Sequence, residues 1–225
     1  MDFNGLEPTD LVDVRCINVE FLEYLAAAQG ETLRHELPLR LRPVVAALTG
    51  RQIQRLADVP FLLLTLHETD AAYWSRILEE LPAHDLFAPG HAALDPLGRI
   101  AAAALGFQWQ LARKNLYAAR LIGGGSLGWC EQLASCTLLR VLQCAAEQPG
   151  LVAPRLATHE VFWTRLLGAG LSSTTEVRRA AHLSALQIML SPLGVSREQR
   201  WRSAACYTSV PRLELRGRRV RGEDG

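Results

Sequence analysis

Residues 124–128 hold the strongest candidate for catalytic chemistry, because Gly-Gly-Ser-Leu-Gly matches the G-x-S-x-G pattern of hydrolases. In that pattern a sharp strand-to-helix turn exposes the nucleophilic serine. Here the preceding residues, 108–121, have a helical pattern, and no alternation of strands and helices predicts a parallel sheet. We therefore expect Ser126 to be the N-cap of a helix that holds residues 129–142, with the glycines forming the turn before it. A Ser126 hydrolase is the least favoured alternative.

Other groups that could support chemistry lack the necessary spacing. The glycine run has no following Lys and Ser/Thr, so a phosphate loop is not expected. The histidines form no H-E-x-x-H pair, and none of the five cysteines belongs to a C-x-x-C pair. We expect the cysteines to be small buried hydrophobic residues of a protein in a reducing compartment. The sequence thus predicts no metal, no cofactor, no evident small-molecule substrate and no enzymatic activity.

An aromatic residue, Trp, a hydroxyl residue, Arg and two aliphatic residues occur in this order twice, at 73–78 and 162–167. One interpretation is structural: the aromatic rings are core residues, and each arginine caps a helix end or pairs with an acid. The other is functional, because Trp and Arg are enriched at binding hot spots. It makes a candidate interface from Trp74, Arg76, Trp163 and Arg165.

These two segments belong to a longer internal repeat. At one offset of 89 positions, residues 51–78 align without gaps on 140–167, with 9 identities in 28 positions. Conservative pairs such as Ile53/Leu142 and Tyr73/Phe162 add to the match. Two copies are too few for a solenoid. We therefore expect two related helical units packed about a pseudo-twofold axis, as in a dimer fused into one chain.

Helical spacing of apolar residues recurs along the chain, so the expected fold class is all-α. The apolar segment 61–66 after Pro60 is too short to assign by periodicity, and helix is favoured there over an extended segment. Breakers divide the chain into a first unit at 1–81, a linker at 82–98, a second unit at 99–194 and a partly disordered tail at 195–225.

Charge and hydropathy exclude several classes of protein. Lys and Arg number 24 against 23 Asp and Glu, a net charge of +1, so no overall field attracts nucleic acid or anionic membranes. No apolar segment approaches the roughly 20 residues of a membrane span, and the acidic start does not resemble a secretory signal. We expect a cytoplasmic protein with no membrane partner. Arginines of the tail are weak candidates for nucleic-acid contact: Arg212, Arg216, Arg218, Arg219 and Arg221.

Two segments resemble the flagellar transcriptional regulator FlhD. Residues 17–22 (Ile-Asn-Val-Glu-Phe-Leu) precede Ala-Ala-Ala-Gln at 26–29, and residues 47–58 contain Ala-Leu-Thr, then Gln, then Leu-Ala-Asp. The resemblance covers about residues 16–68, with a fainter match at 133–139 and 145–147. It implies an all-helical, dimeric regulator of transcription that works with a subunit carrying a cysteine zinc site. Nothing here resembles that subunit's clustered cysteines.

The leading hypothesis is therefore a non-enzymatic FlhD-like regulator that acts through a protein partner, with DNA as a second candidate partner in that complex. The alternative is a helical adaptor or chaperone-like module of a secretion or motility system, with the repeated Trp and Arg residues at a shared interface.

Overall fold

The computed structural model describes residues 6–80, 95–148 and 150–191. These residues are predominantly helical, which confirms the all-α fold class. The described residues belong to one compact unit, whose elements are given below. The predicted tail and most of the predicted linker lie outside the described residues. No helix in the described ranges is long and apolar enough to span a membrane.

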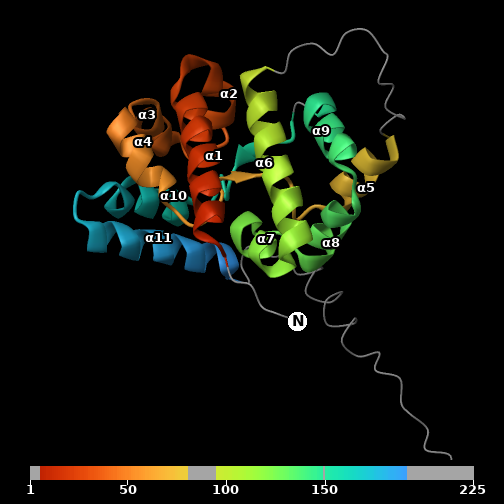
Figure 1. Ribbon diagram of the computed structural model, residues 1–225. Helices are drawn as coiled ribbons and strands as arrows, with labels where there is room; N and C mark the ends of the chain where they lie inside the picture. Colours follow the sequence, from red (N-terminus) through yellow and green to blue (C-terminus); the bar gives the residue numbers. More distant parts are fainter. Residues whose placement is uncertain (1–5, 81–94, 149, 192–225) are drawn as a thin grey trace, which may run out of the picture. The chain divides into compact units, whose positions relative to one another are not determined.

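The first half of this unit consists of α1 (Pro8–Ala26), η1 (Ala28–Gly30), α2 (Glu31–Arg34), η2 (Leu39–Leu41), α3 (Arg42–Ala46), α4 (Gly50–Ala57), β1 (Leu64–Thr65) and α5 (Ala71–Glu80). The long helix α1 packs against α2, α3 and α4, whereas α5 lies apart from it beside α8 (Leu127–Ser135) and α9 (Leu138–Glu147) (Figure 1). The FlhD-like residues 47–58 lead into and form α4. Thr49 accepts a hydrogen bond from the Gln52 backbone N–H, and Gln52 accepts one from the Thr49 N–H at 2.9 Å, which completes a capping box.

The second half contains a comparable series. Its elements are α6 (Pro96–Lys114), α7 (Leu116–Gly123), α8 (Leu127–Ser135), α9 (Leu138–Glu147), β2 (Ala153–Pro154), α10 (Glu160–Leu167), η3 (Ala169–Leu171) and α11 (Thr175–Leu190). α6 begins at Pro96, with Asp95 as its N-cap. Residues 96–98, which the sequence assigned to the linker, therefore form the first turn of α6.

The long helices α1 and α6 have the same length and lie side by side (Figure 1). Each has 19 residues and a proline in its first turn, where no intrahelical N–H bond is lost. α4 packs on α1, and α9 packs on α6. One continuous apolar core joins the two halves, and it includes Phe21, Leu56 and Leu105. The order of helix, short strand and helix recurs at α4, β1 and α5 and at α9, β2 and α10, whereas duplication of a whole unit stays a prediction.

The helical interpretation of residues 61–66 is wrong. The segment is extended and contains β1, which pairs antiparallel with β2 in the register Leu64↔Pro154 and Thr65↔Ala153. Residues 61–64 are all 0% exposed, so both sides of the segment are covered and the alternation that marks a strand is absent from the sequence. Its backbone is satisfied by distant groups: Leu62 N–H donates to Ile122 O, and Leu63 N–H donates to Asn18 Oδ1.

Two predicted helices are each divided in two. Residues 108–121 belong to α6 and α7, which are separated at Asn115, whose side chain accepts from the N–H groups of Tyr117 and Ala118. Residues 129–142 belong to α8 and α9, separated at Cys136 and Thr137. Thr137 accepts from the Arg140 N–H and starts the new helix. Both breaks are N-caps inside an otherwise helical pattern, which periodicity alone does not reveal.

Candidate functional site

The two halves cross where β1 meets β2, and three buried polar residues meet at this crossing: Asn18, Glu68 and Arg155. The backbone N–H of Arg155 donates to the carbonyl oxygen of Leu63 at 2.8 Å, so the antiparallel pairing continues beyond β1 and β2. Asn18 of α1 reaches the same place, donating to Phe61 O at 2.9 Å and accepting from Leu63 N–H at 2.8 Å. The extended segment is therefore held on both sides.

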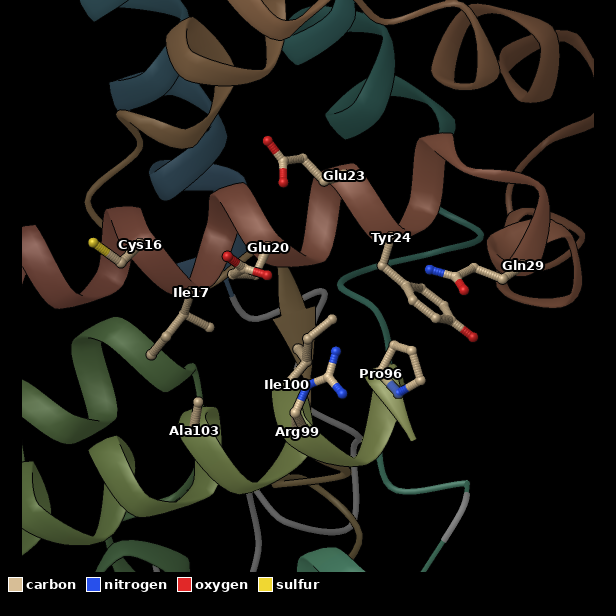
Figure 2. Close-up of a pocket in the computed structure, with 10 residues that line it drawn as sticks. All are labelled: Cys16, Ile17, Glu20, Glu23, Tyr24, Gln29, Pro96, Arg99, Ile100 and Ala103. Carbon is tan, nitrogen blue, oxygen red and sulfur yellow. The ribbon is translucent and has the colours of Figure 1, made fainter. Parts of the chain in front are cut away.

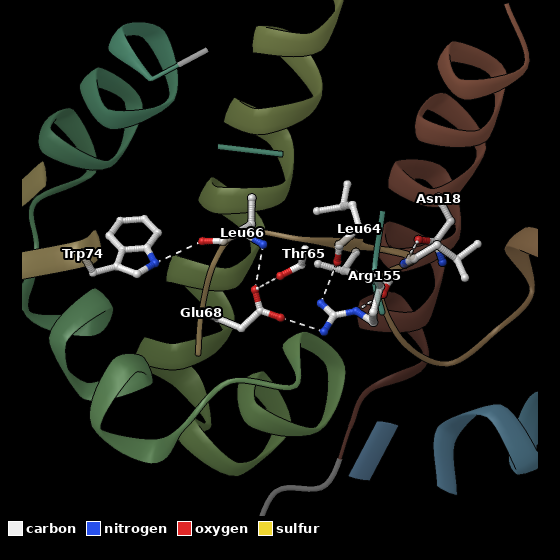
Figure 3. A network of polar contacts seen from close by, with 9 residues as sticks. Asn18, Leu64, Thr65, Leu66, Glu68, Trp74 and Arg155 are labelled. Atoms are coloured by element: carbon white, nitrogen blue, oxygen red, sulfur yellow. Dashed lines mark hydrogen bonds and ion pairs between the residues drawn. The ribbon is translucent and has the colours of Figure 1, made fainter. Parts of the chain in front are cut away.

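Arg155 and Glu68 form a buried ion pair at this crossing (Figure 3). Their side chains are 5% and 3% exposed, and Arg155 Nη1 lies 2.7 Å from Glu68 Oε1. The guanidinium also donates from Nε to Leu62 O and from Nη2 to Leu64 O. The second carboxylate oxygen, Oε2, accepts from Thr65 Oγ1 and from Leu66 N–H, each at 2.7 Å. We call this arrangement the Arg155–Glu68 clasp.

The chemistry of the clasp is structural. A buried charge pair is tolerated only when geometry and hydrogen bonds offset the loss of hydration. Here Nε, Nη1 and Nη2 of Arg155 all donate to protein acceptors, and both oxygens of Glu68 accept from protein donors. Both carboxylate oxygens are therefore engaged by protein donors, and the side chain is buried, which makes Glu68 a poor candidate for a general base. What the clasp does is fix residues 62–68 against residue 155.

Two indoles flank the clasp in equivalent ways. Trp74 Nε1 donates to Leu66 O at 3.0 Å, and Trp163 Nε1 donates to Arg155 O at 2.9 Å. Each bond spans eight residues, and both partners are related by the offset of 89. The non-glycine residues with positive φ, His67 at 55° and Leu156 at 46°, are related by the same offset. The two segments thus share an unusual turn as well as a sequence pattern.

The predicted interface residues separate into two kinds. Trp74 and Trp163 are 2% and 0% exposed, which agrees with the interpretation of the rings as core residues. Arg76 and Arg165 are exposed. Arg76 lies over the Tyr73 ring, 5.8 Å from its centroid, and Arg165 Nη1 donates to Ser184 Oγ. An interface role stays a prediction, and the exposed arginines are the members of the group that a partner could reach.

Ser126 is the N-cap of a helix, as predicted. Its Oγ accepts from the Trp129 N–H at 3.0 Å, and the turn before it joins two helices, α7 and α8. The glycines are required by packing against the clasp. Gly124 has φ +73°, and a Cβ there would lie 2.7 Å from Arg155 Nη1. A Cβ on Gly125 would lie 2.8 Å from the Trp129 ring and 3.1 Å from Glu68 Cβ. The glycine run therefore lets the backbone approach the buried pair.

Of the four cysteines in the described ranges, two are buried and two are not. Cys130 and Cys144 are buried, Cys136 is intermediate and Cys16 is exposed, all as free thiols. Burial raises the pKa of Cys130 to about 12 and that of Cys144 to about 11. Within the described residues no three His, Cys, Asp or Glu side chains are grouped to hold a metal ion. Cys206 and the five tail arginines lie outside the described residues.

A groove of about 500 Å³ lies between α1 and α6 (Figure 2). Ile17 and Ile100 contribute apolar surface, and the charged residues of the lining are Glu20, Glu23 and Arg99. Burial, with a smaller contribution from Asp95, raises the pKa of the nearby Tyr24 phenol. Two carboxylates against one guanidinium make this groove unfavourable for the phosphates of a nucleic acid.

We compared the chain with known protein families, curated proteins and solved structures. No family model, curated protein or solved structure matches the chain. Function is therefore inferred from the geometry of this crossing and from the surfaces of the two halves.

Proposed function

We propose that this chain is a non-enzymatic regulatory protein that acts by binding a protein partner through an apolar surface on α9. The observation that carries the proposal is a difference between two positions related by the repeat. Ile53 on α4 is 4% exposed, whereas Leu142, its counterpart on α9, is 42% exposed. Among the described residues, the second half thus leaves open a position that the first half covers.

The packing of the two helices explains the difference. α4 contacts α1 on one side and η3 on another, so Ile53 is enclosed. α9 contacts α6 extensively and leaves a stripe of apolar residues in solvent. The stripe consists of Leu138 at 46%, Leu139 at 43% and Leu142 at 42% exposure, with exposed Ala146 one turn further on. We call these four residues the α9 stripe.

The α9 stripe has the chemistry of a surface for another helix. Residues 138, 142 and 146 are four apart and so share one helix face. Adjoining exposed leucines mark protein interaction sites more often than isolated ones do. An amphipathic helix with its own apolar residues at spacings of three and four is the partner that fits such a face.

The resemblance to FlhD supports a role in transcription, in the cytoplasm and in a complex with the partner. Residues 47–58, which carry the more specific part of that resemblance, form a capped helix whose apolar side, Ile53 and Leu56, is buried. DNA contact is part of this proposal only for the complex, because the groove between α1 and α6 is acidic. The adaptor hypothesis uses the same surface without DNA.

The test is co-purification of the full chain from its native host, comparing the wild type with Leu142→Asp. A charge in the α9 stripe should reduce recovery of a specific partner at least tenfold, because an unpaired charge would be buried in the contact. The matched control is Leu39→Asp, since Leu39 is 76% exposed on η2 and outside the stripe. A partner retained equally by both variants would refute the proposed surface.

A gel shift then separates regulator from adaptor. The complex recovered with the wild type is mixed with genomic DNA fragments, and a shift that requires the partner supports the regulatory role. A stable complex that shifts no fragment assigns the protein to the adaptor class instead.

A further inference from the structure

A pocket of about 410 Å³ lies among the first half of α1, the end of α4 and the first half of α11. Its polar lining consists of Arg15, Asp58, Thr175, Arg178, Arg179 and His182. It is separate from the Arg155–Glu68 clasp and from the α9 stripe, because it shares no residue with either.

The charges of the lining leave a positive excess. Arg15 Nε lies 3.0 Å from Asp58 Oδ1, so these two charges offset each other. Arg178 Nη1 donates to the Ser172 carbonyl at 2.9 Å, a neutral acceptor that leaves its charge uncompensated. Arg179 is exposed and forms no ion pair within the described residues. Two guanidinium groups on one turn of α11 thus present oxyanion-binding donors at the pocket.

His182 contributes a buried polar group to the lining of the pocket. The side chain is 5% exposed, and its buried Nε2 has no hydrogen-bond partner within the described chain. A neutral imidazole always carries one N–H donor and one acceptor nitrogen, and leaving such a group unpaired in the interior is costly. Burial lowers the pKa of His182, and Asp58 opposes this by raising it. Arg178 lowers the pKa by a smaller amount, and the backbone of Gly170 beside the ring raises it. A ligand that accepts a hydrogen bond from Nε2 of His182 would satisfy this buried atom.

The start of α11 adds to the preference for an anion. The helix has 16 residues, and the hydroxyl of its N-cap, Thr174, makes no capping hydrogen bond. Thr175, in its first turn, lines the pocket. Free N–H groups and the positive end of the helix dipole both favour a negative ligand there, and the carboxylate of Glu176 in the same turn offsets part of this preference.

We propose that this pocket binds the phosphate group of a small organic phosphate, with Arg178 and Arg179 contacting its oxygens. The remaining lining is apolar, from Leu11, Val12, Val59 and Pro60, and contacts the carbon part of the ligand. The volume is within the range of small-molecule sites and exceeds what a bare phosphate ion would fill. No motif in the sequence indicates such a ligand.

Calorimetric titration of the full chain tests the proposal, with phenyl phosphate as the probe and benzoate and inorganic phosphate as comparisons. We expect phenyl phosphate to bind more tightly than either, because it alone has both the dianion and an apolar body. Arg179→Gln should weaken its binding about ten- to a hundredfold through loss of a charge-assisted contact. Arg51→Gln is the matched control, because Arg51 is an exposed arginine on α4 outside the pocket.

Nuclear magnetic resonance of the imidazoles provides a second readout. Phenyl phosphate should shift the ring signals of His182 and leave those of exposed His35 unchanged. Absence of binding at millimolar probe, or equal weakening by Arg179→Gln and Arg51→Gln, would overturn the proposal. Displacement of phenyl phosphate by a 20-base-pair DNA duplex would overturn the small-molecule assignment. None of these results depends on the α9 stripe, so the two proposals fail separately.

Discussion

Arg155 and Glu68 lie 87 residues apart in the chain, yet their side chains are in contact at 2.7 Å, with both almost completely buried. Each completes the hydrogen bonding of the other, and together they also satisfy the backbone of residues 62–66. The stability of the crossing should therefore depend on both charges being present.

Glu68→Gln should lower the free energy of unfolding by about 3–5 kcal/mol, because it leaves the Arg155 charge buried without a counter-ion. Urea denaturation of the full chain measures this. Glu160→Gln is the control, since Glu160 pairs with Arg40 on the surface and the side chains are 46% and 63% exposed. Its loss should be about 1 kcal/mol or less. Equal losses in the two variants would show that the clasp contributes no more than a surface pair.

The repeat alignment contains a sign of the Arg155–Glu68 pair that hydrophobic periodicity does not reveal. In the repeat alignment Arg155 stands opposite Leu66, and Glu68 stands opposite Ala157. Each half thus replaces an apolar residue by a charge, and the two charges are opposite and meet across the pairing of β1 with β2. A charge next to an apolar segment in only one copy of a repeat is therefore informative when the copies are expected to pack together.

The sequence predicts the structure correctly where residues close in the chain determine it, as at the helix N-cap Ser126. Ser126 as an N-cap depends on the glycines before it and the backbone N–H three residues after it. Residues 61–66 were misread because their conformation is set by Asn18, Ile122 and residues 153–155, all distant in the chain. The pocket at α11 was missed for the same reason, since Arg15 and Arg178 come together only in the fold.

The tryptophans should behave as core residues. Trp163→Ala should lower the free energy of unfolding by about 3–5 kcal/mol, because the ring is 0% exposed and its removal leaves a cavity. Trp163→Phe keeps most of the ring but leaves Arg155 O without its donor, a loss of about 1–3 kcal/mol. Thermal or urea unfolding gives both values.

Arg165→Ala is the control in the same hexapeptide, and it should change stability by about 0.5 kcal/mol, because the side chain is exposed. If Trp163→Ala kept the wild-type midpoint but lost a partner, the interface interpretation of the ring would be restored and the core interpretation abandoned.

The thiols should differ in their reactivity towards iodoacetamide at pH 8. The thiolate is the reactive form, and a pKa of about 12 leaves about one Cys130 in ten thousand ionised. An unfolded cysteine, with a pKa near 8.5, is about one quarter ionised at the same pH. Cys16 is exposed and should be alkylated first, Cys144 slowly and Cys130 last. Peptide mass spectrometry after timed quenching resolves the order, and in 8 M urea all three should react at similar rates. Rapid native alkylation of Cys130 would mean that α8 opens readily towards solvent, and the Glu68 carboxylate packed nearby would then lose the protection on which the clasp depends.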